Sequence, residues 1–204
     1  MKTWITSDIH FSHKNILKYC PHRMKSSFIG DMNDMTPEEI TEAVDIMNEY
    51  IIKNWNILVS KDDTVFILGD VAMGQIKDAP ALISRLNGNK ILILGNHDKT
   101  LKKLIKNDDC LSDLFVSIHD YYEYSHVYNG KKVMLCMSHF PMRHWNSQNQ
   151  GTLMLHGHLH GSPCDVPGRI KDVGLDTNYL FPYLLDDVIE ELLKIELIEE
   201  HHKE

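Results

Sequence analysis

The chain has 204 residues, 43% of them hydrophobic and 25% charged, and its formal net charge is −8 with the histidines neutral. This composition is typical of a globular protein and excludes a mainly disordered chain, and the length predicts a single domain over residues 1–204. The negative charge disfavours a protein that coats extended duplex nucleic acid, because like charges repel.

Nothing in the sequence indicates export or a membrane. The opening residues MKTWITSDIH contain no apolar run, so they predict no signal peptide. No apolar stretch reaches the roughly 20 residues needed to cross a bilayer. The cysteines are widely spread and form no CxxC pair, which favours reduced thiols. We therefore expect a soluble cytoplasmic protein, and the oligomeric state stays open.

The first half of the chain alternates strands and helices. The pattern predicts strands over 2–6, 64–68 and 90–94, and helices over 36–54 and 78–86. The first helix has a clear start, with Thr36 as N-cap, Pro37 at the first helical position and Glu39 three residues after the cap. Both later strands are continuously apolar, which is typical of strands buried on both faces.

Strands dominate the second half of the chain. Asn129-Gly130 predicts a hairpin turn between strands over 121–128 and 131–137. Shorter strands are expected over 152–155 and 172–175, and a closing helix over 184–197. The class is therefore α/β, with helices covering a mixed central sheet or with two sheets packed face to face.

Short polar motifs follow five of the predicted strands. They are Asp8-x-His10, Gly69-Asp70, Gly95-Asn96-His97-Asp98, Ser138-His139 and Gly157-His158-x-His160. Ligand sites in open α/β sheets gather outside the carboxyl ends of the strands. We therefore expect these motifs to converge on one point.

The residue types in these motifs suit a metal centre. Carboxylate, imidazole and amide groups bind ions such as Mn, Fe or Zn, and no cysteine is offered. On an extended segment, the two side chains of Asp8-x-His10 or His158-x-His160 point the same way, because residues two apart share a face. The set provides enough ligands for two ions about 3.5–4 Å apart, the usual arrangement for attack on a phosphorus ester. The predicted ligands are Asp8, His10, Asp70, Asn96, His139, His158 and His160.

Each motif alone has an ordinary explanation. Asp-x-His or Gly-Asp after a strand is most often a polar surface turn. His156-Gly-His158-Leu-His160 is harder to explain this way, because a core rarely needs three histidines in five residues. The order of the motifs, all at strand ends, argues against coincidence.

The series DxH, GD, GNHD, H and GHxH, from Asp8 to His160, resembles the signature of the calcineurin-like metallophosphoesterase superfamily. The resemblance implies a four-layer α/β/β/α sandwich with two packed mixed sheets and a metal site at the strand ends. It further implies that Asp8, His10 and His160 hold one ion, that Asn96, His139 and His158 hold the other, and that Asp70 bridges them. His97 would face the leaving group, and Asp98 would orient His97.

Three stretches resemble the small stand-alone phosphoesterases of bacteria and phages: TSDIHFSHKNI, NWN and HFPMRHW. The eukaryotic-type protein phosphatases have an arginine shortly after the Gly-Asp motif and a glutamate after GNH. Here residues 69–74 contain no arginine, and Asp98 follows His97. These differences argue against protein phosphatase activity.

The implied reaction is hydrolysis of a phosphodiester, either a nucleotide or another small ester, by a hydroxide that bridges two divalent ions while His97 assists the leaving group. Manganese is the first choice of metal, and Fe, Zn, Ni and Co also suit the ligands. A nuclease, a phosphomonoesterase or a nucleotide pyrophosphatase would use the same centre. From other classes of protein, the alternatives are a non-catalytic binding scaffold of this fold and a structural metal protein.

Substrate contacts are less well defined by the sequence. His13 follows the first motif closely, and Arg143 and His144 follow His139, so all three are candidates, as is Arg23 in the polar loop. An arginine binds phosphate well through its planar fork of donors. The loops 20–35 and 139–151 are expected to select the substrate. Trp55 and Trp145 are expected to pack in the core.

Overall fold

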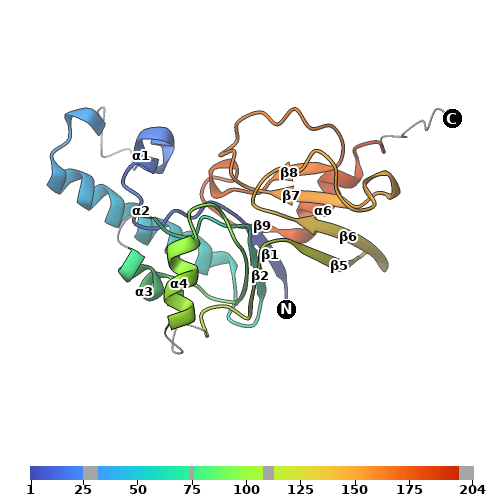
Figure 1. Ribbon diagram of the computed structural model, residues 1–204, viewed down its shortest axis with the longest axis horizontal. Helices are drawn as coiled ribbons and strands as arrows, with labels where there is room; N and C mark the ends of the chain where they lie inside the picture. Colours follow the sequence, from blue (N-terminus) through green and yellow to red (C-terminus); the bar gives the residue numbers. More distant parts are fainter. Residues whose placement is uncertain (25–31, 74–75, 108–112, 198–204) are drawn as a thin grey trace.

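Two mixed β-sheets pack face to face in the computed structural model, which describes residues 1–24, 32–73, 76–107 and 113–197 (Figure 1). The first sheet contains β1 (Thr3–Thr6), β2 (Thr64–Ile67), β3 (Asn89–Ile93), β4 (Ser117–His119) and β9 (Tyr183–Leu184). The second contains β5 (Tyr122–Tyr128), β6 (Lys131–Met137), β7 (Leu153–His156) and β8 (Ile170–Asp172). The helices are α1 (Ile16–Tyr19), α2 (Pro37–Leu58), α3 (Ala79–Ser84), α4 (Lys99–Asn107) and α6 (Leu185–Leu193).

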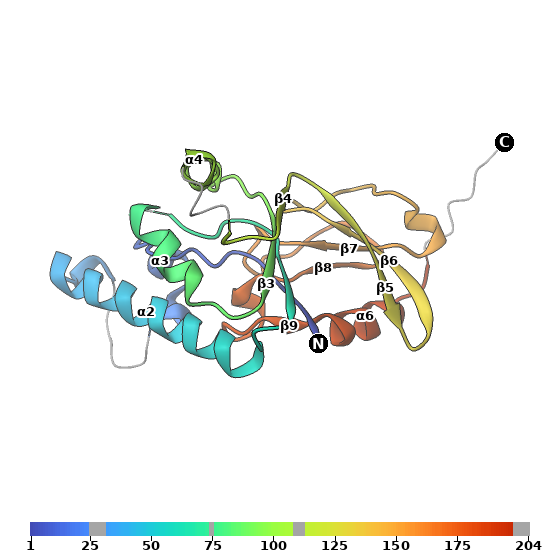
Figure 2. The same cartoon turned by 90° about the horizontal axis from the view of Figure 1, so that it is seen from below.

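Parallel pairing dominates both sheets. In the order β4-β3-β2-β1-β9, neighbouring strands from β4 to β1 are parallel and β9 is antiparallel to β1. In the order β5-β6-β7-β8, only the β5–β6 hairpin is antiparallel. Figure 2 shows α2 and α3 on one side of the first sheet, and the second sheet with α6 on the other. The α/β class with two packed mixed sheets is therefore confirmed.

The central strands of the first sheet are buried on both faces. Val65 of β2 belongs to the core on the helical side, and its neighbour Phe66 belongs to the core between the sheets. Successive side chains of a strand point to opposite faces, so a strand covered on both sides has to be apolar throughout. This burial explains the unbroken apolar runs in the sequence.

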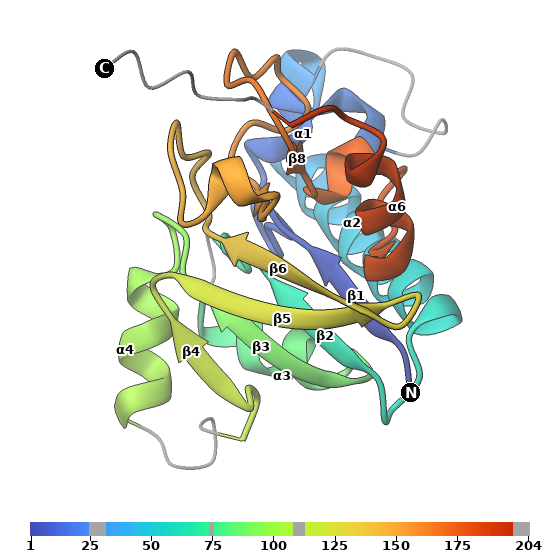
Figure 3. The same ribbon diagram turned by 90° about the vertical axis from the view of Figure 1, so that its right-hand side faces the viewer.

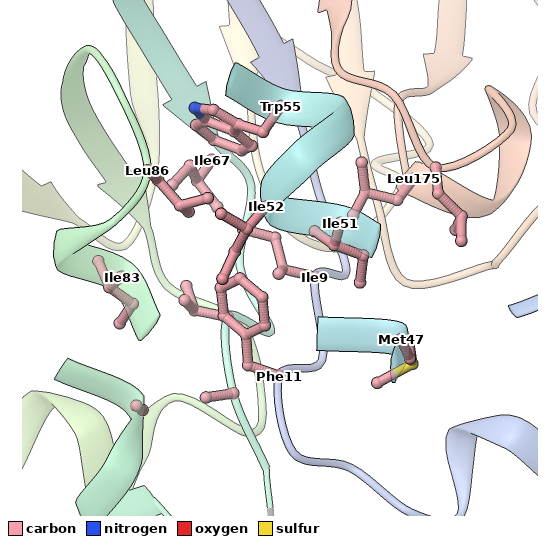
Figure 4. Packing of buried hydrophobic residues seen from close by; sticks show 14 of the residues in the cluster. Ile9, Phe11, Met47, Ile51, Ile52, Trp55, Ile67, Ile83, Leu86 and Leu175 are labelled. Carbon is pink, nitrogen blue, oxygen red and sulfur yellow. The ribbon is translucent and has the colours of Figure 1, made fainter. Parts of the chain in front are cut away.

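Helix α2 covers the first sheet and is well specified by its sequence. Thr36 and Glu39 form the expected capping box, and the helix continues to Leu58, past the predicted end. Figure 4 shows Ile51, Ile52 and Trp55 of α2 among the buried side chains of this core. The indole nitrogen Nε1 of Trp55 donates to the carbonyl of Asn87 at 2.9 Å. The predicted packing role of Trp55 is confirmed.

The outer face of the second sheet is covered by a loop. Cys136 of β6 and Met154 of β7 point away from the inter-sheet core and pack with Trp145. Nε1 of Trp145 donates to the carbonyl of Thr152 at 2.8 Å. Trp145 therefore has the packing role predicted for it, and it anchors the loop that begins at His139.

Some elements differ from the sequence expectations. Helix α4 and strand β4 were not predicted, and β8 ends at Asp172, where a strand over 172–175 was expected to begin.

The described cysteines Cys20, Cys136 and Cys164 are free, while Cys110 lies outside the described residues. Among the described helices, none combines the length and hydrophobicity needed to cross a membrane.

Candidate metal centre

The predicted strand-end motifs meet at one edge of the molecule. Strands β1, β2 and β3 run side by side in the same direction, so their carboxyl ends share an edge (Figure 3). Backbone hydrogen bonds also join the loops that follow these strands. For example, the amide of Asp8 donates to the carbonyl of Gly69 at 3.0 Å. In the second sheet, the amide of Gly157 donates to the carbonyl of His139 at 3.0 Å.

Asp8, His10 and His160 form a first group of ligand atoms. Oδ1 of Asp8 lies 3.8 Å from Nε2 of His10 and 3.8 Å from Nε2 of His160. The second carboxylate oxygen of Asp8 accepts the amide of His158 at 2.9 Å. When ligand atoms bind one ion at about 2.0–2.2 Å, the distance from one ligand atom to the next is similar to these separations of 3.8 Å. This group can therefore hold a divalent cation.

Asp70 and His139 are the centre of a second group. Oδ2 of Asp70 lies 3.5 Å from Nε2 of His139, and the same nitrogen lies 2.9 Å from Oδ1 of Asn96. The ring of His158 is 5.1 Å from that of His139. Oδ2 of Asp70 also lies 3.8 Å from Nε2 of His10, so this carboxylate stands between the two groups.

Unpartnered buried atoms support a cation at this place. Oδ1 of Asp8 and Nε2 of His10 are buried, and neither has a hydrogen-bond partner among the residues that the structure describes. Leaving such groups unpaired is costly, and a bound cation would satisfy both. Burial raises the pKa of Asp8 to about 6, although the charges of His160 and His139 act in the opposite direction. Burial lowers the pKa of His10 far below its usual value, which keeps a lone pair free for a metal.

The backbone at the ligands is left-handed. The φ angles are 56° at Asp8, 55° at His10, 54° at Asp70, 72° at His158 and 50° at His160. The expectation that Asp8-x-His10 and His158-x-His160 are extended is therefore wrong. Asp and His tolerate this region better than most residues, and such conformations are concentrated at functional sites. The loops bring the paired side chains together by sharp turns.

Two glycines make room for the ligands. Gly69 has a φ of +92°, and a Cβ there would lie 2.5 Å from the amide nitrogen of Gly95. A Cβ at Gly157 would overlap Oγ of Ser7 and Oδ2 of Asp8. The Gly-Asp and Gly-His motifs thus reflect backbone segments that are closely packed beside the ligands.

Asp98 does not have the role predicted for it. Its buried carboxylate accepts the amides of Gly95, Asp70 and Val71 at 2.8, 2.8 and 2.9 Å. None of its hydrogen bonds among the described residues is to the His97 ring. The prediction that Asp98 orients His97 is wrong, because the carboxylate is occupied in fastening the Asp70 loop to the Asn96 loop.

His97 stands at the open side of the centre. Its Nε2 lies 3.9 Å from Oδ2 of Asp70, and its side chain is 37% exposed. Its amide donates to Oδ1 of Asp70 at 3.0 Å, which fixes the residue beside the ligands. The ring is therefore placed to contact a molecule bound at the centre.

Asp176 is a site residue that the sequence analysis missed. Its Oδ2 lies 2.6 Å from Nδ1 of the predicted ligand His160, and its carboxylate also accepts hydrogen bonds from Nε and Nη2 of Arg23 at 2.7 and 2.6 Å. Burial lowers the pKa of His160, but Asp176, Cys20 and Asp8 raise it more, to about 10. Holding Nδ1 turns Nε2 towards Asp8, as carboxylates commonly do for metal-binding histidines. Asp176 directly follows the predicted strand 172–175, so the strand-end rule already pointed to it.

Arg23 is not available for a phosphate. Its guanidinium is buried, pairs with Asp176 and donates to the carbonyls of Asp8 and Ile9 at 2.6 and 2.9 Å. The expectation that Arg23 grips substrate is wrong. The same pairing argues against a separate metal site at Cys20, His160 and Asp176, because Arg23 already neutralises the carboxylate.

Of the other predicted substrate contacts, His13 lies at the candidate centre, whereas Arg143 and His144 line a separate cavity. His13 joins the centre, with Nδ1 3.3 Å from Nδ1 of His10. Arg143 and His144 are exposed and line a cavity of about 310 Å³ with Trp145. In the described part of the chain, neither has a hydrogen bond or ion pair with a predicted ligand. Part of the predicted selecting loop, residues 25–31, lies outside the described residues.

Two packed mixed sheets with carboxylates and imidazoles at their common edge define an α/β protein with a candidate metal centre. The sequence profile of the calcineurin-like phosphoesterase family matches residues 1–202. The chain belongs to this family.

Several relatives support this assignment. An uncharacterized protein of Methanocaldococcus jannaschii, MJ1445, is 32% identical over 80% of this chain and 72% of its own length. The gene 66 protein of Mycobacterium phage L5 is 29% identical over 85% of this chain and 86% of its own. The crystal structure of AQ665, a protein of unknown function from Aquifex aeolicus, has a TM-score of 0.64 at 21% identity and covers 93% of this chain and 98% of its own. The last comparison supports the fold.

Proposed function

We propose that this protein is a metal-dependent phosphodiesterase that hydrolyses a nucleotide or another small phosphodiester. The observation that carries the proposal is the position of Asp70, whose Oδ2 lies 3.8 Å from His10 and 3.5 Å from His139, between two groups of ligand atoms. That arrangement suits two cations bridged by one carboxylate. Membership of the calcineurin-like phosphoesterase family adds the class of bond that is cleaved.

The residues divide into two ligand sets around Asp70. Asp8, His10 and His160 would hold one ion, and Asn96, His139 and His158 the other. Divalent ions there would neutralise phosphate charge and lower the pKa of water from 15.7 to about 7. Manganese remains our first choice, because mixed carboxylate and imidazole ligands accept it together with Fe, Zn, Ni and Co.

His97 would act on the substrate and not on the ions. Its Nε2 is at the open side, where it can donate a proton or a hydrogen bond to the departing oxygen. Proton transfer by a positioned side chain contributes roughly 10²–10⁴-fold to a rate. A non-catalytic scaffold of this fold would not need His97, and no predicted ligand is missing from this chain.

Metal add-back tests the proposal. The protein is stripped of metal, supplied singly with Mn²⁺, Zn²⁺, Ni²⁺ or Mg²⁺, and assayed on bis-p-nitrophenyl phosphate and p-nitrophenyl phosphate. We expect metal-dependent hydrolysis that is faster on the diester, and loss of it in Asp70→Asn. Two bound ions per chain without hydrolysis of either ester would point to the scaffold instead, and faster hydrolysis of the monoester would point to a phosphomonoesterase.

A further inference from the structure

An exposed aromatic ring borders the candidate metal centre. Phe140 follows the ligand His139 directly and is 47% exposed. Its ring centroid lies 4.6 Å from the ring of His158 and 4.9 Å from the ring of His139. A large apolar side chain is thus open to solvent beside two of the predicted ligands.

Phe140 and His97 border different parts of the centre. The His97 ring lies 5.9 Å from that of His10, in the first ligand group, whereas Phe140 contacts His139 and His158 of the second group. A phosphodiester carries two substituents on one phosphorus atom. When the leaving oxygen meets His97, the retained substituent is the one that can reach Phe140.

We propose that Phe140 forms a stacking subsite for an aromatic base on the retained substituent, so that the substrate is a nucleotide-type diester. This inference rests on the proposed function and names its substrate class. Bases stack on aromatic side chains through their π-faces, and one such contact changes binding by roughly tenfold. No hydrogen bond is required, so the subsite accepts any base.

A structural role for Phe140 makes a different prediction. If the ring served only to pack against His139 and His158, its removal would disturb the ligands and lower turnover of every ester equally. A stacking subsite changes the preference between esters with and without a base, while the metal content stays constant. The preference ratio therefore separates the two roles.

The test uses two diesters with the same leaving group. Thymidine 5′-(p-nitrophenyl phosphate) carries a base, and the corresponding 1,2-dideoxyribose ester lacks it. We expect wild-type kcat/KM to favour the thymidine ester by roughly tenfold. Phe140→Ala should reduce this ratio to about one with metal content unchanged, whereas Phe140→Tyr should keep it. Tyr19→Ala, which removes an aromatic ring that is 72% exposed outside the centre, should match wild type.

Two results would overturn the subsite: a wild-type ratio near one, or a uniform loss on both esters in Phe140→Ala. A binding experiment separates this outcome from failure of the proposed function. Metal-loaded protein is titrated calorimetrically with thymidine 5′-monophosphate and with 1,2-dideoxyribose 5-phosphate, which requires no turnover. Tighter binding of the thymidine compound that depends on Phe140 upholds the subsite even if neither diester is cleaved, and equal binding rejects it.

Discussion

His97 differs from its neighbours in what it contacts. The predicted ligands His10 and His139 are buried, whereas the His97 side chain is 37% exposed and lies 3.9 Å from the carboxylate of Asp70. A ring in this position can serve the substrate without holding a metal. Its removal should therefore affect turnover and metal content to different degrees.

We predict that His97→Ala lowers kcat by roughly 10²–10⁴-fold, the usual contribution of a positioned proton donor. Both metals should stay bound, because the seven predicted ligands are untouched. Kinetics on the diester and metal analysis of the same sample check this. His119→Ala is the matched control, since its ring contacts Ser117 and Tyr122. Metal content that falls in parallel with activity would refute the assignment.

Asp176 contacts a predicted metal ligand, His160. Because it holds Nδ1 of His160 at 2.6 Å, the Asp176→Asn variant should weaken the orientation of this ligand. Loss of such a supporting partner typically costs 10–100-fold in metal affinity, so we predict a decrease of about that size. Competition with a chromophoric chelator measures it. Asp165→Asn makes the same chemical change on an exposed loop and should bind metal as wild type does. Equal affinities in the two variants would contradict the role of Asp176.

At the residue scale, the sequence predicted which side chains gather but not what supports them. Every predicted ligand lies at the centre. The pairing of Arg23 with Asp176 could not be derived, because it joins residues 153 apart in sequence through the tertiary fold. The role of Asp98 could not be predicted from the sequence either. Its carboxylate accepts the amides of Asp70, Val71 and Gly95, which point towards it only because the two loops turn sharply.

At the scale of elements, the turns at two strand ends differ in how closely they are packed: the turn at Gly69 is crowded, and the hairpin turn at Gly130 is open. Gly69 and Gly130 both have positive φ angles, of 92° and 76°. A Cβ at Gly69 would meet the Gly95 backbone, but a Cβ at Gly130 would meet nothing within 4 Å. The two glycines therefore allow the cost of a conformation to be separated from the cost of a steric clash.

We predict that Gly130→Ala costs about 1–2 kcal/mol of unfolding free energy, the penalty of a left-handed conformation for an L-residue. Gly69→Ala should cost more and should also lower metal content, because the clash displaces the loops that carry Asp70 and Asn96. Urea unfolding and metal analysis provide both values. Equal destabilisation with full metal content in both variants would contradict this prediction. It would show that the Gly69 loop shifts to accommodate the Cβ without displacing the predicted ligands.

The elements themselves were predicted unequally. Strands β1, β2 and β3, the β5–β6 hairpin and the helix α2 follow strong local signals: buried apolar runs, Asn129-Gly130 and the capping box at Thr36. Helix α4 has no such start, since it follows the GNHD motif directly. Strand β8 is three residues long and owes its pairing to β7. Such an element depends on its neighbours, which a local pattern does not record.

On the scale of the whole molecule, this acidic chain buries the carboxylate of Asp8 where a cation is expected. The chain carries a net charge of −8, and burial raises the pKa of Asp8 to about 6. A raised carboxyl pKa means that Asp8 adds stability to the metal-free protein below its unfolded pKa of 3.8, and that this stability is lost as the pH rises through about 6. Above that pH, a bound cation compensates the buried charge.

We therefore predict that metal stabilises the protein more at pH 7.5 than at pH 5. Protons compete with the metal for Asp8 and for His160, whose pKa is raised to about 10, so metal affinity rises with pH. At about 100 times Kd, the metal should add roughly 2.7 kcal/mol, or roughly 5–10 °C in Tm. Thermal melts of stripped and reloaded protein measure this. Asp8→Asn should reduce the pH dependence without abolishing it, because protons still compete with the metal for His160, and an equal Tm shift at both pH values in wild type would contradict the prediction.

The candidate centre draws on both sheets: Asp8, Asp70 and Asn96 follow strands of the first, and His139 and His158 follow strands of the second. The sheets otherwise meet mainly through side chains: an isolated bridge links Ser7 to Gly174, where the amide of Leu175 donates to the carbonyl of Ser7 at 3.0 Å, but no ladder of backbone hydrogen bonds joins the sheets in the described chain. Cations held by ligands from both sheets would thus cross-link the two sheets at one end of the molecule. Separating the sheets would then require breaking metal–ligand bonds, so loading the centre should slow proteolysis of the whole chain as well as enable its chemistry.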